Sequence, residues 1–426
     1  MRWLRRRRLP AATCTVVLAT CLTADWWTES PAMPAQGQKE AAMKKARKKA
    51  AHRHRRIIMN NDGNDCRVRT GAEQTKNAET FLSKRTSPLV GSQVDAIFYC
   101  TGIVNVYTHH SQLTEPRHTA DRAVQDWAYE LKEIEGRDSL EIMVEFGHEH
   151  GMEAFWSMRM NDTHDSADAT LLCQWKKEHP EYLMGTKQDG FRYGGGRWSA
   201  LDYAVPEARE RIFRILEDVS ARYDVDGIEL DFFRHPVYFK PQMTGDPVTQ
   251  EHCDLLTGLL RRVREMTEQV AAGRDRPMLI AVRVPDSVGY ARAIGLDIVR
   301  WLEDDLIDIV TGGGYFHLEP WENLVALGRR YDVPVYAGLS ASRIVSPSQP
   351  ESKGAIEVWR GEARRAWDAG VSGIYTFNRF NPSDPIFREL GSLETLRGLP
   401  ATYEYNAGRA MGRWLKGGDD FIKGDG

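Results

Sequence analysis

The chain has 426 residues, of which 42% are hydrophobic and 27% charged, a composition typical of a globular protein with ample residues for a core. Its 36 Gly, its 19 Pro and the lack of an apolar run near about 18 residues exclude collagen-like, low-complexity and membrane-spanning classes. The formal net charge is −3, but residues 1–56 hold 14 Lys or Arg against 3 Asp or Glu, which leaves −14 for residues 57–426. This acidic body has no electrostatic reason to bind nucleic acid.

Residues 1–24 have the features of a secretory signal peptide. Arg2 and Arg5–Arg8 make the start positively charged, and the apolar stretch Ala11–Leu22 is too short to span a bilayer. We therefore expect export to the periplasm or the extracellular space. No Ala-x-Ala site follows the apolar stretch, and Leu18–Cys21 is only an imperfect lipoprotein site, so lipid anchoring at Cys21 is the weaker alternative.

Residues 25–56 are predicted to be a basic tether. Residues 39–56 read KEAAMKKARKKAAHRHRR, which has good helix propensity but no sustained apolar face, so we expect its side chains to be solvated. Contact with an anionic lipid or cell-wall polymer is an alternative role. His52 and His54 have metal-like HxH spacing but lie in this exposed run, and no metal is expected there.

From residue 57 onward, short apolar runs alternate with amphipathic helical stretches, a pattern that predicts a parallel sheet wound with helices. Eight strands are predicted, at Ile57–Asn61, Val94–Cys100, Glu153–Met158, Gly227–Phe233, Leu279–Val284, Ile307–Thr311, Val333–Leu339 and Gly373–Asn378. Helices are predicted at Ala120–Glu135, Leu140–His150, Pro206–Tyr223, Glu251–Ala272, Trp321–Arg330 and Ala355–Ala369. Eight such units predict a (β/α)8 TIM barrel of the α/β class over residues 57–382, followed by a C-terminal extension at residues 383–426.

Polar residues gather where these strands end. Asn60–Asp65 closes the first strand, Arg159–His164 the third, Asp231–His235 the fourth and Arg283–Asp286 the fifth. Barrel enzymes place their chemistry at the C-terminal ends of the strands. Because clustered polar groups cost stability unless they are paired or used, this end of the barrel is the predicted site.

The fourth strand carries the sharpest signal, the sequence DGIELDFF at residues 226–233. A period of two turns Ile228, Leu230 and Phe232 toward the helices and turns Glu229 and Asp231 toward the barrel axis. Asp231 is interpreted as catalytic because its position at the rim lets a ligand reach it. For Glu229 a structural role is equally open, as a buried acid paired with Arg159 or Arg283.

The segments IIMNNDGND, GMEAFWSMRMNDTHD, DGIELDFFRHP, LIAVRVPDS and GVSGIYTFN, in this order, resemble the bacterial family-10-like glycosyl hydrolases, a glycosyl-hydrolase-like group of (β/α)8 barrels. The resemblance covers most of residues 57–382. It implies carbohydrate hydrolysis by acidic residues at the strand ends, and the matching positions here are Asp231 and its neighbour Glu229. The acid segment of true family-10 xylanases has no match in this chain, so the resemblance does not transfer their activity or catalytic pair.

Cleavage of a glycosidic bond requires two carboxyl groups, one as acid and one as nucleophile or base. Glu229 and Asp231 project in parallel at different depths, so a pair across the barrel mouth is favoured, in which Asp231 acts with Asp286, Asp162 or Asp62. We expect Asp231→Asn to abolish turnover while leaving binding and melting temperature nearly intact.

Candidate substrate-binding residues lie at strand ends or in the Gly-rich loop Gly185–Tyr203, where flat rings and a few polar groups suit a sugar. The arginines near the mouth would also suit an acidic or sulfated sugar. The candidates are Asn60, Asp62, Trp156, Arg159, Asn161, Trp198, Arg234, His235, Arg283, Tyr315 and Asn378.

No metal or cofactor is expected. The first strand lacks the HxH of metal-dependent barrels, no GxGxxG follows a strand, and Cys66, Cys100, Cys173 and Cys253 show no zinc-like spacing. Gly312–Gly314 is instead predicted to let the backbone approach a neighbour closely. The expected partner is a carbohydrate, and the alternative to an enzyme is a carbohydrate-binding barrel that has lost its acid pair.

Overall fold

The computed structural model describes residues 34–117, 124–167, 172–344, 355–408 and 411–424. The predicted signal peptide and Cys21 lie outside the described residues. The chain divides into residues 1–41 and residues 42–426, and the second unit contains the barrel. Among the described helices, none combines the length and apolar character needed to cross a bilayer.

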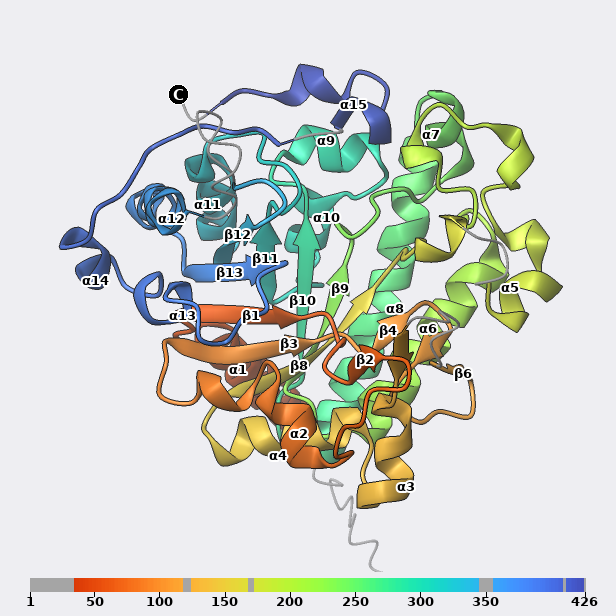
Figure 1. Ribbon diagram of the computed structural model, residues 1–426. Helices are drawn as coiled ribbons and strands as arrows, with labels where there is room; N and C mark the ends of the chain where they lie inside the picture. The colour runs from red at the N-terminus through yellow and green to blue at the C-terminus, as the bar shows by residue number, and fades with distance from the viewer. Residues whose placement is uncertain (1–33, 118–123, 168–171, 345–354, 409–410, 425–426) are drawn as a thin grey trace, which may run out of the picture. The chain divides into compact units, whose positions relative to one another are not determined.

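Eight parallel strands close into a barrel, which confirms the predicted (β/α)8 fold (Figure 1). The order around the barrel is β1, β13, β12, β11, β10, β9, β8 and β3. The strands are β1 (Ile57–Asn61), β3 (Val94–Tyr99), β8 (Glu153–Arg159), β9 (Gly227–Asp231), β10 (Leu279–Val284), β11 (Ile309–Gly312), β12 (Val335–Ser340) and β13 (Gly373–Phe377). Every predicted strand is present, and all boundaries agree within two residues.

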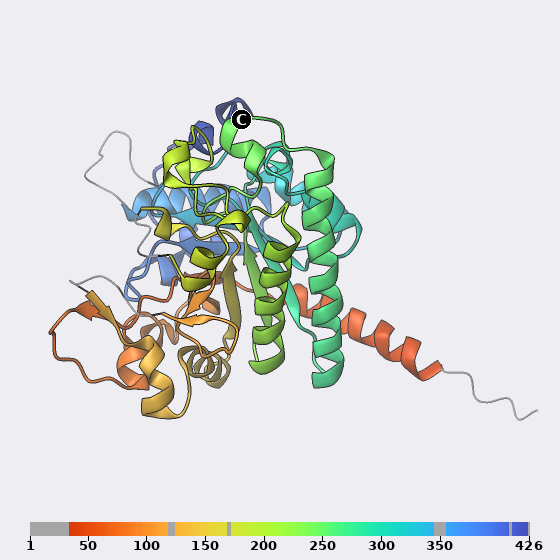
Figure 2. The same cartoon turned by 90° about the vertical axis from the view of Figure 1, so that its right-hand side faces the viewer.

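The helices follow the strands as expected, and the long helices α6 and α8 pack against each other (the green pair in Figure 2). The helices with predicted counterparts are α4 (Ser139–Glu149), α6 (Pro206–Arg222), α8 (Gln250–Arg274), α11 (Trp321–Arg330) and α12 (Ile356–Ala369). Shorter helices are α2 (Ala78–Ser83), α3 (Leu131–Glu135), α5 (Gln174–Glu178), α7 (Lys240–Thr244), α9 (Val288–Ala293), α10 (Ile298–Glu303), α13 (Ile386–Glu389), α14 (Leu393–Arg397) and α15 (Met411–Trp414).

The predicted helix Ala120–Glu135 is wrong over most of its described length. Residues 124–126 form β7, which pairs antiparallel with β2 (Arg67–Arg69), and helix α3 begins only at Leu131. A small sheet of β4 (Gly102–Ile103), β5 (Val106–Tyr107) and β6 (Glu115–Pro116) follows β3. The pairing of β7 depends on a partner distant in sequence, β2, so local helix propensity did not reveal it.

Alternate residues of each strand face the barrel interior. The inward apolar side chains form one cluster of Ile58, Ala96, Phe98, Phe155, Leu279, Ala281, Ile309, Tyr336, Tyr375 and Phe377. Ile228 and Leu230 belong to the separate cluster between strands and helices, as predicted. The barrel is therefore filled with side chains below its C-terminal end.

The N-terminal end of the barrel is closed by a residue of the predicted tether. Arg55 is fully buried and donates to both carboxylate oxygens of Glu153, at 2.5 and 3.0 Å, and to the carbonyls of Ala50, Ala51 and Arg53. Arg47, on α1 (Pro34–Ala51), is buried against Asp308. The expectation that the side chains of this run are solvated is therefore wrong for Arg47 and Arg55, because strand-end carboxylates pair with them.

The C-terminal extension crosses the loops at the opposite end. Tyr405 donates to the carbonyl of His317, Tyr290 donates to the carbonyl of Met411, and Gln242 donates to that of Trp414. The segment thus ties together loops that follow β9, β10 and β11. It adds a structural layer beside the predicted site.

Candidate active site

Asp231 lies at the C-terminal end of β9 between two arginines of the neighbouring strands. Strand register places it beside Arg159 of β8 and Arg283 of β10. Arg283 Nη2 lies 2.7 Å from Asp231 Oδ2, and the backbone N–H of Phe233 donates to Oδ1 at 2.9 Å. Asp231 faces the axis as predicted, but it is only 1% exposed, so the expectation of an open rim position is wrong for this structure.

Aromatic rings enclose the Arg283 guanidinium. Its centre lies 4.0 Å from the ring of Phe377 and 5.8 Å from that of Phe233. Gly314 allows this packing, because a Cβ atom there would come within 2.8 Å of Arg283 Nη1, and its φ of 149° suits glycine. The close backbone approach predicted for the glycine run is thus present. Arg283 Nη1 and Nε have no hydrogen-bond partner.

Glu229 lies one layer below Asp231 on the same strand. Its Oε2 accepts from Ser157 Oγ at 2.5 Å and from the Tyr375 hydroxyl at 3.1 Å, and its Oε1 has no hydrogen-bond partner. Burial, followed by the charge of Asp231, raises the pKa of Glu229 to about 7. The predicted pairing with Arg159 or Arg283 is wrong, because Arg283 forms its ion pair with Asp231 and Arg159 with Asp162.

The raised pKa of Glu229 predicts a specific pH dependence of stability. The folded value is about 7 against an ordinary 4.5, so its contribution is fully present below about pH 4.5 and is lost as pH rises through about 7. Glu229→Gln removes this loss, so the variant should gain stability relative to wild type by at most roughly 1.4 kcal/mol per pH unit. Urea unfolding of both proteins from about pH 5 to about pH 8 measures the difference. If the free energies of unfolding of the two proteins change with pH in parallel, the prediction is contradicted. Burial also raises the pKa of Asp65, to about 6, but Asp65 is present in both proteins, so its effect cancels in the difference.

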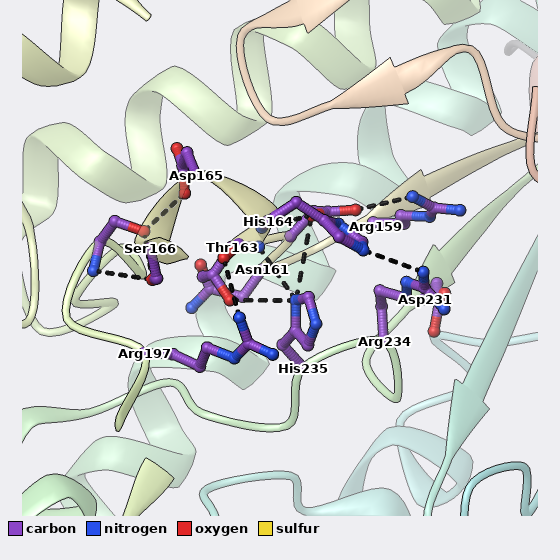
Figure 3. Close-up of polar contacts among 12 residues, drawn as sticks. Arg159, Asn161, Thr163, His164, Asp165, Ser166, Arg197, Asp231, Arg234 and His235 are labelled. Atoms are coloured by element: carbon purple, nitrogen blue, oxygen red, sulfur yellow. Dashed lines mark hydrogen bonds and ion pairs between the residues drawn. The ribbon is translucent and has the colours of Figure 1, made fainter. Parts of the chain in front are cut away.

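A second polar network joins the ends of β1 and β8. Figure 3 shows the part of it around Arg159. Arg159 Nη1 lies 2.7 Å from Asp162 Oδ2, and Arg159 Nη2 lies 3.8 Å from Asp62 Oδ2. Asp62 also pairs with Arg85. Burial alone would raise the pKa of Asp62, but Arg159 and Arg85 outweigh it and lower the pKa. Asp62 is 8% exposed, more than any other predicted rim carboxylate.

Asp162, His164 and His235 are close enough to suggest a metal site, with one ligand atom of each within 4.8 Å of the others. Their hydrogen bonds argue against it. The backbone N–H of Thr163 donates to His235 Nδ1 at 3.0 Å, and His164 Nδ1 lies 2.5 Å from Asp162 Oδ1. Arg159 is ion-paired with the same aspartate. The lone pairs that would bind a cation are engaged, and the nearby positive charge opposes a cation.

Two predicted site residues, Asp286 and Asn161, hold loops in place. Asp286 Oδ2 accepts from His317 Nδ1 and from the backbone N–H groups of Leu318 and Glu319, at 2.8 to 3.0 Å. Asn161 is bonded through its amide to Leu201 and Val237. These bonds orient both side chains toward the backbone of the surrounding loops, which favours a supporting role over contact with substrate.

The aromatic and amide residues predicted to contact substrate differ in how exposed they are. Trp156 is fully buried in the layer between strands and helices, and its indole N–H donates to Thr101, so its prediction as a substrate contact is wrong. Trp198 is 8% exposed and donates to the carbonyl of Ser166. Asn60 is 2% exposed, whereas Tyr315 and Asn378 are half-buried. Tyr315 accepts a hydrogen bond from Arg234, and Asn378 donates one to Ser342.

Sequence reasoning missed several members of the site. Arg85 follows α2, in an excursion that carries no motif, yet it pairs with Asp62. Tyr375 was within a predicted strand, and strict alternation along β13 would have placed it inward with Phe377. His164 follows the Asn-Asp-Thr run after β8, and its proximity to polar strand-end residues was the available signal.

Residues 107–252 match the family model described as glycosyl hydrolase-like 10, which confirms the resemblance over this part of the chain. No curated protein sequence matches the chain at a significant level.

Solved structures with a similar fold include three glycoside hydrolase barrels. A family 18 N-acetylglucosaminidase from Paenibacillus barengoltzii is 11% identical, over 80% of this chain and 99% of that one, with a TM-score of 0.43. The PgaB (BpsB) glycoside hydrolase domain from Bordetella bronchiseptica is 14% identical over 80% and 99%, with a TM-score of 0.46. The catalytic domain of chitinase B from Arthrobacter TAD20 is 10% identical over 84% and 99%, with a TM-score of 0.45. At these identities the likeness concerns the fold alone.

Proposed function

We propose, from the match of residues 107–252 to the glycosyl hydrolase-like 10 family, that this protein is an exported glycoside hydrolase acting on a poly- or oligosaccharide at the C-terminal end of its barrel. The basic and apolar segments of residues 1–24 support export. The observation that carries the proposal is the meeting of Asp62, Arg159, Asp231 and Arg283 at the ends of β1, β8, β9 and β10.

Asp62 and Glu229 have environments suited to opposite tasks. Arg159 and Arg85 keep Asp62 ionised, as a base or nucleophile requires. Glu229, one layer below Asp231, retains a proton up to about pH 7. In the proposed mechanism, Glu229 is a positioning residue whose proton passes to Asp231 and from Asp231 to the leaving oxygen as the glycosidic bond breaks. Asp62 attacks the anomeric carbon or removes the proton of the attacking water. A pair of carboxyl groups with separated pKa values is the usual arrangement for acid and base.

A carbohydrate-binding barrel without catalysis is the second candidate. Its support is that Asp62, Asp162, Glu229, Asp231 and Asp286 each have hydrogen-bond or ion-pair partners, and that none is more than 8% exposed. Cleavage requires the side chains around Asp231 to open when sugar binds. Binding alone requires no such movement.

A panel of polysaccharides assayed for new reducing ends tests the proposal. We expect at least one glycan to release reducing sugar with the wild-type protein and none with Asp231→Asn. Affinity for a glycan without new reducing ends would replace the enzyme with the binding barrel. If the protein neither binds nor cleaves any of the neutral and charged glycans tested, both candidates are contradicted.

A further inference from the structure

Three arginines at the barrel mouth have no carboxylate partner among the described residues. Arg197 follows the glycine turn Gly194–Gly196, Arg234 follows β9, and Arg413 lies on α15. Arg197 donates to the carbonyl of Thr163 at 3.3 Å and Arg413 to that of Gly195 at 3.0 Å. Arg234 donates to the Tyr315 hydroxyl and to His164 Nε2. The other strand-end arginines, such as Arg159 and Arg283, are in ion pairs.

Arg413 and Arg234 both lie close enough to act on the charge of Arg197. Burial lowers the pKa of Arg197, and the positive charges of Arg413 and Arg234 lower it further, while Asp162 and Tyr315 partly oppose this. Contacts between their loops agree with this, because the ring of Trp414, next to Arg413, lies 5.8 Å from that of His235, next to Arg234. Among the described residues, nothing accepts a hydrogen bond from the buried Nε atoms of Arg197 and Arg234. Figure 3 shows these two arginines on either side of His235, so each brings positive charge and an unused donor to this part of the mouth.

The acids close to this group form their ion pairs with other arginines. Asp162 is engaged by Arg159 at 2.7 Å and by His164 at 2.5 Å, and Asp62 is paired with Arg85. Arg234 donates to His164 Nε2, and His164 Nδ1 faces Asp162. His164 therefore links Arg234 to Asp162. Since residues 57–426 carry −14 overall, the unpaired cations are a local exception rather than part of a basic surface.

We propose that Arg197 and Arg234 form a subsite for an anionic substituent of a sugar, a carboxylate or a sulfate, with Arg413 adding charge at its outer edge. Guanidinium groups bind such anions through paired, charge-assisted hydrogen bonds. The inference rests on the proposed function and names its substrate class, an acidic glycan. The half-buried position of Arg197 and Arg234 favours one ordered substituent over a loose polyanion contact.

Titration calorimetry with two matched ligand pairs tests the subsite. The first pair is an oligogalacturonate and its carboxyl-reduced form, and the second is a sulfated galactan oligosaccharide and its desulfated form. We expect wild-type protein to bind one charged ligand at least about tenfold more tightly than its neutral partner, since a charge-assisted hydrogen bond has about that effect. Whichever pair shows the preference identifies the substituent.

Variants assign the preference to residues. Arg197→Gln and Arg234→Gln should each lose most of the charge preference. Arg192→Gln is the matched control, because Arg192 is an exposed arginine of the same loop whose guanidinium lies over the ring of Tyr193, at 5.4 Å, and forms no ion pair with another described residue. Arg197→Gln should also melt no lower than wild type, since it removes a cation that other cations repel.

Two results would overturn the inference: equal binding of the charged and neutral forms in both pairs, or an equal loss of preference in Arg192→Gln. Failure of the subsite is distinguishable from failure of the proposed function. Release of reducing ends from neutral glycans without any charge preference leaves the hydrolase standing and removes the subsite. If the protein binds charged glycans selectively but releases reducing ends from no glycan, the subsite stands and the hydrolase is removed.

Discussion

Asp231→Asn should lower turnover of a cleaved glycan by roughly 100-fold to 10,000-fold, the range expected for loss of a positioned acid or base. Unlike the expectation from sequence alone, it should also destabilise the fold. The substitution leaves the Arg283 guanidinium, which is fully buried, without its counter-charge at 2.7 Å. Breaking such a buried pair typically costs about 3–5 kcal/mol. Initial rates of reducing-sugar release and urea unfolding measure the two effects separately.

Asp308→Asn is the matched control for this experiment. Asp308 is also 1% exposed and pairs with Arg47 and Arg264 at 2.7 Å each, but it precedes β11 at the N-terminal end of the barrel. It should lose similar stability and keep its turnover at a temperature where both variants are folded. If the two variants lose turnover equally, instability explains the loss and Asp231 has no direct role.

Arg55→Ala should lower the free energy of unfolding by about 3–5 kcal/mol, because it leaves the buried Glu153 without its hydrogen-bonded arginine and removes five hydrogen bonds. Arg53→Ala should cost under about 1 kcal/mol, since Arg53 is exposed, donates to the carbonyl of Gly151 and lies 3.7 Å from Glu153 without a hydrogen bond to it. Chemical denaturation of the full chain gives both values. If Arg55→Ala lowers the free energy of unfolding as little as Arg53→Ala, residues 39–56 are the solvated tether predicted from sequence.

The two stability predictions probe opposite ends of one barrel. Arg55 closes the end where strands begin, and Arg283 pairs with Asp231 where they finish. Both are arginines inside a closed sheet, and each is tolerated because a carboxylate of a neighbouring strand or segment meets it. Loss of turnover is expected only at the second end, because barrel enzymes carry out their chemistry there.

Much of the architecture could be predicted from sequence because it follows from local periodicity. Alternation along DGIELDFF turned Glu229 and Asp231 to the axis, and eight apolar runs separated by helical stretches gave strands that agree with the barrel within two residues. These features depend on the geometry of a strand and on burial of one face, which neighbouring residues determine. The predicted helix at Ala120–Glu135 failed where strand β7 found its partner about 57 residues earlier in the chain, at Arg67–Arg69.

The amino-acid sequence by itself determined which side chains enter the barrel and at which end polar groups gather. Only the tertiary structure decided their partners: Arg283 pairs with Asp231 across 52 residues, Asp286 is held by the loop at His317, and Arg85 reaches Asp62 from an excursion without a motif. The physical reason is that alternation is a property of one strand, whereas an ion pair depends on the register and loops that bring two strands together. That same packing brought Arg197 and Arg234 to the mouth, where neither forms an ion pair with a described acid.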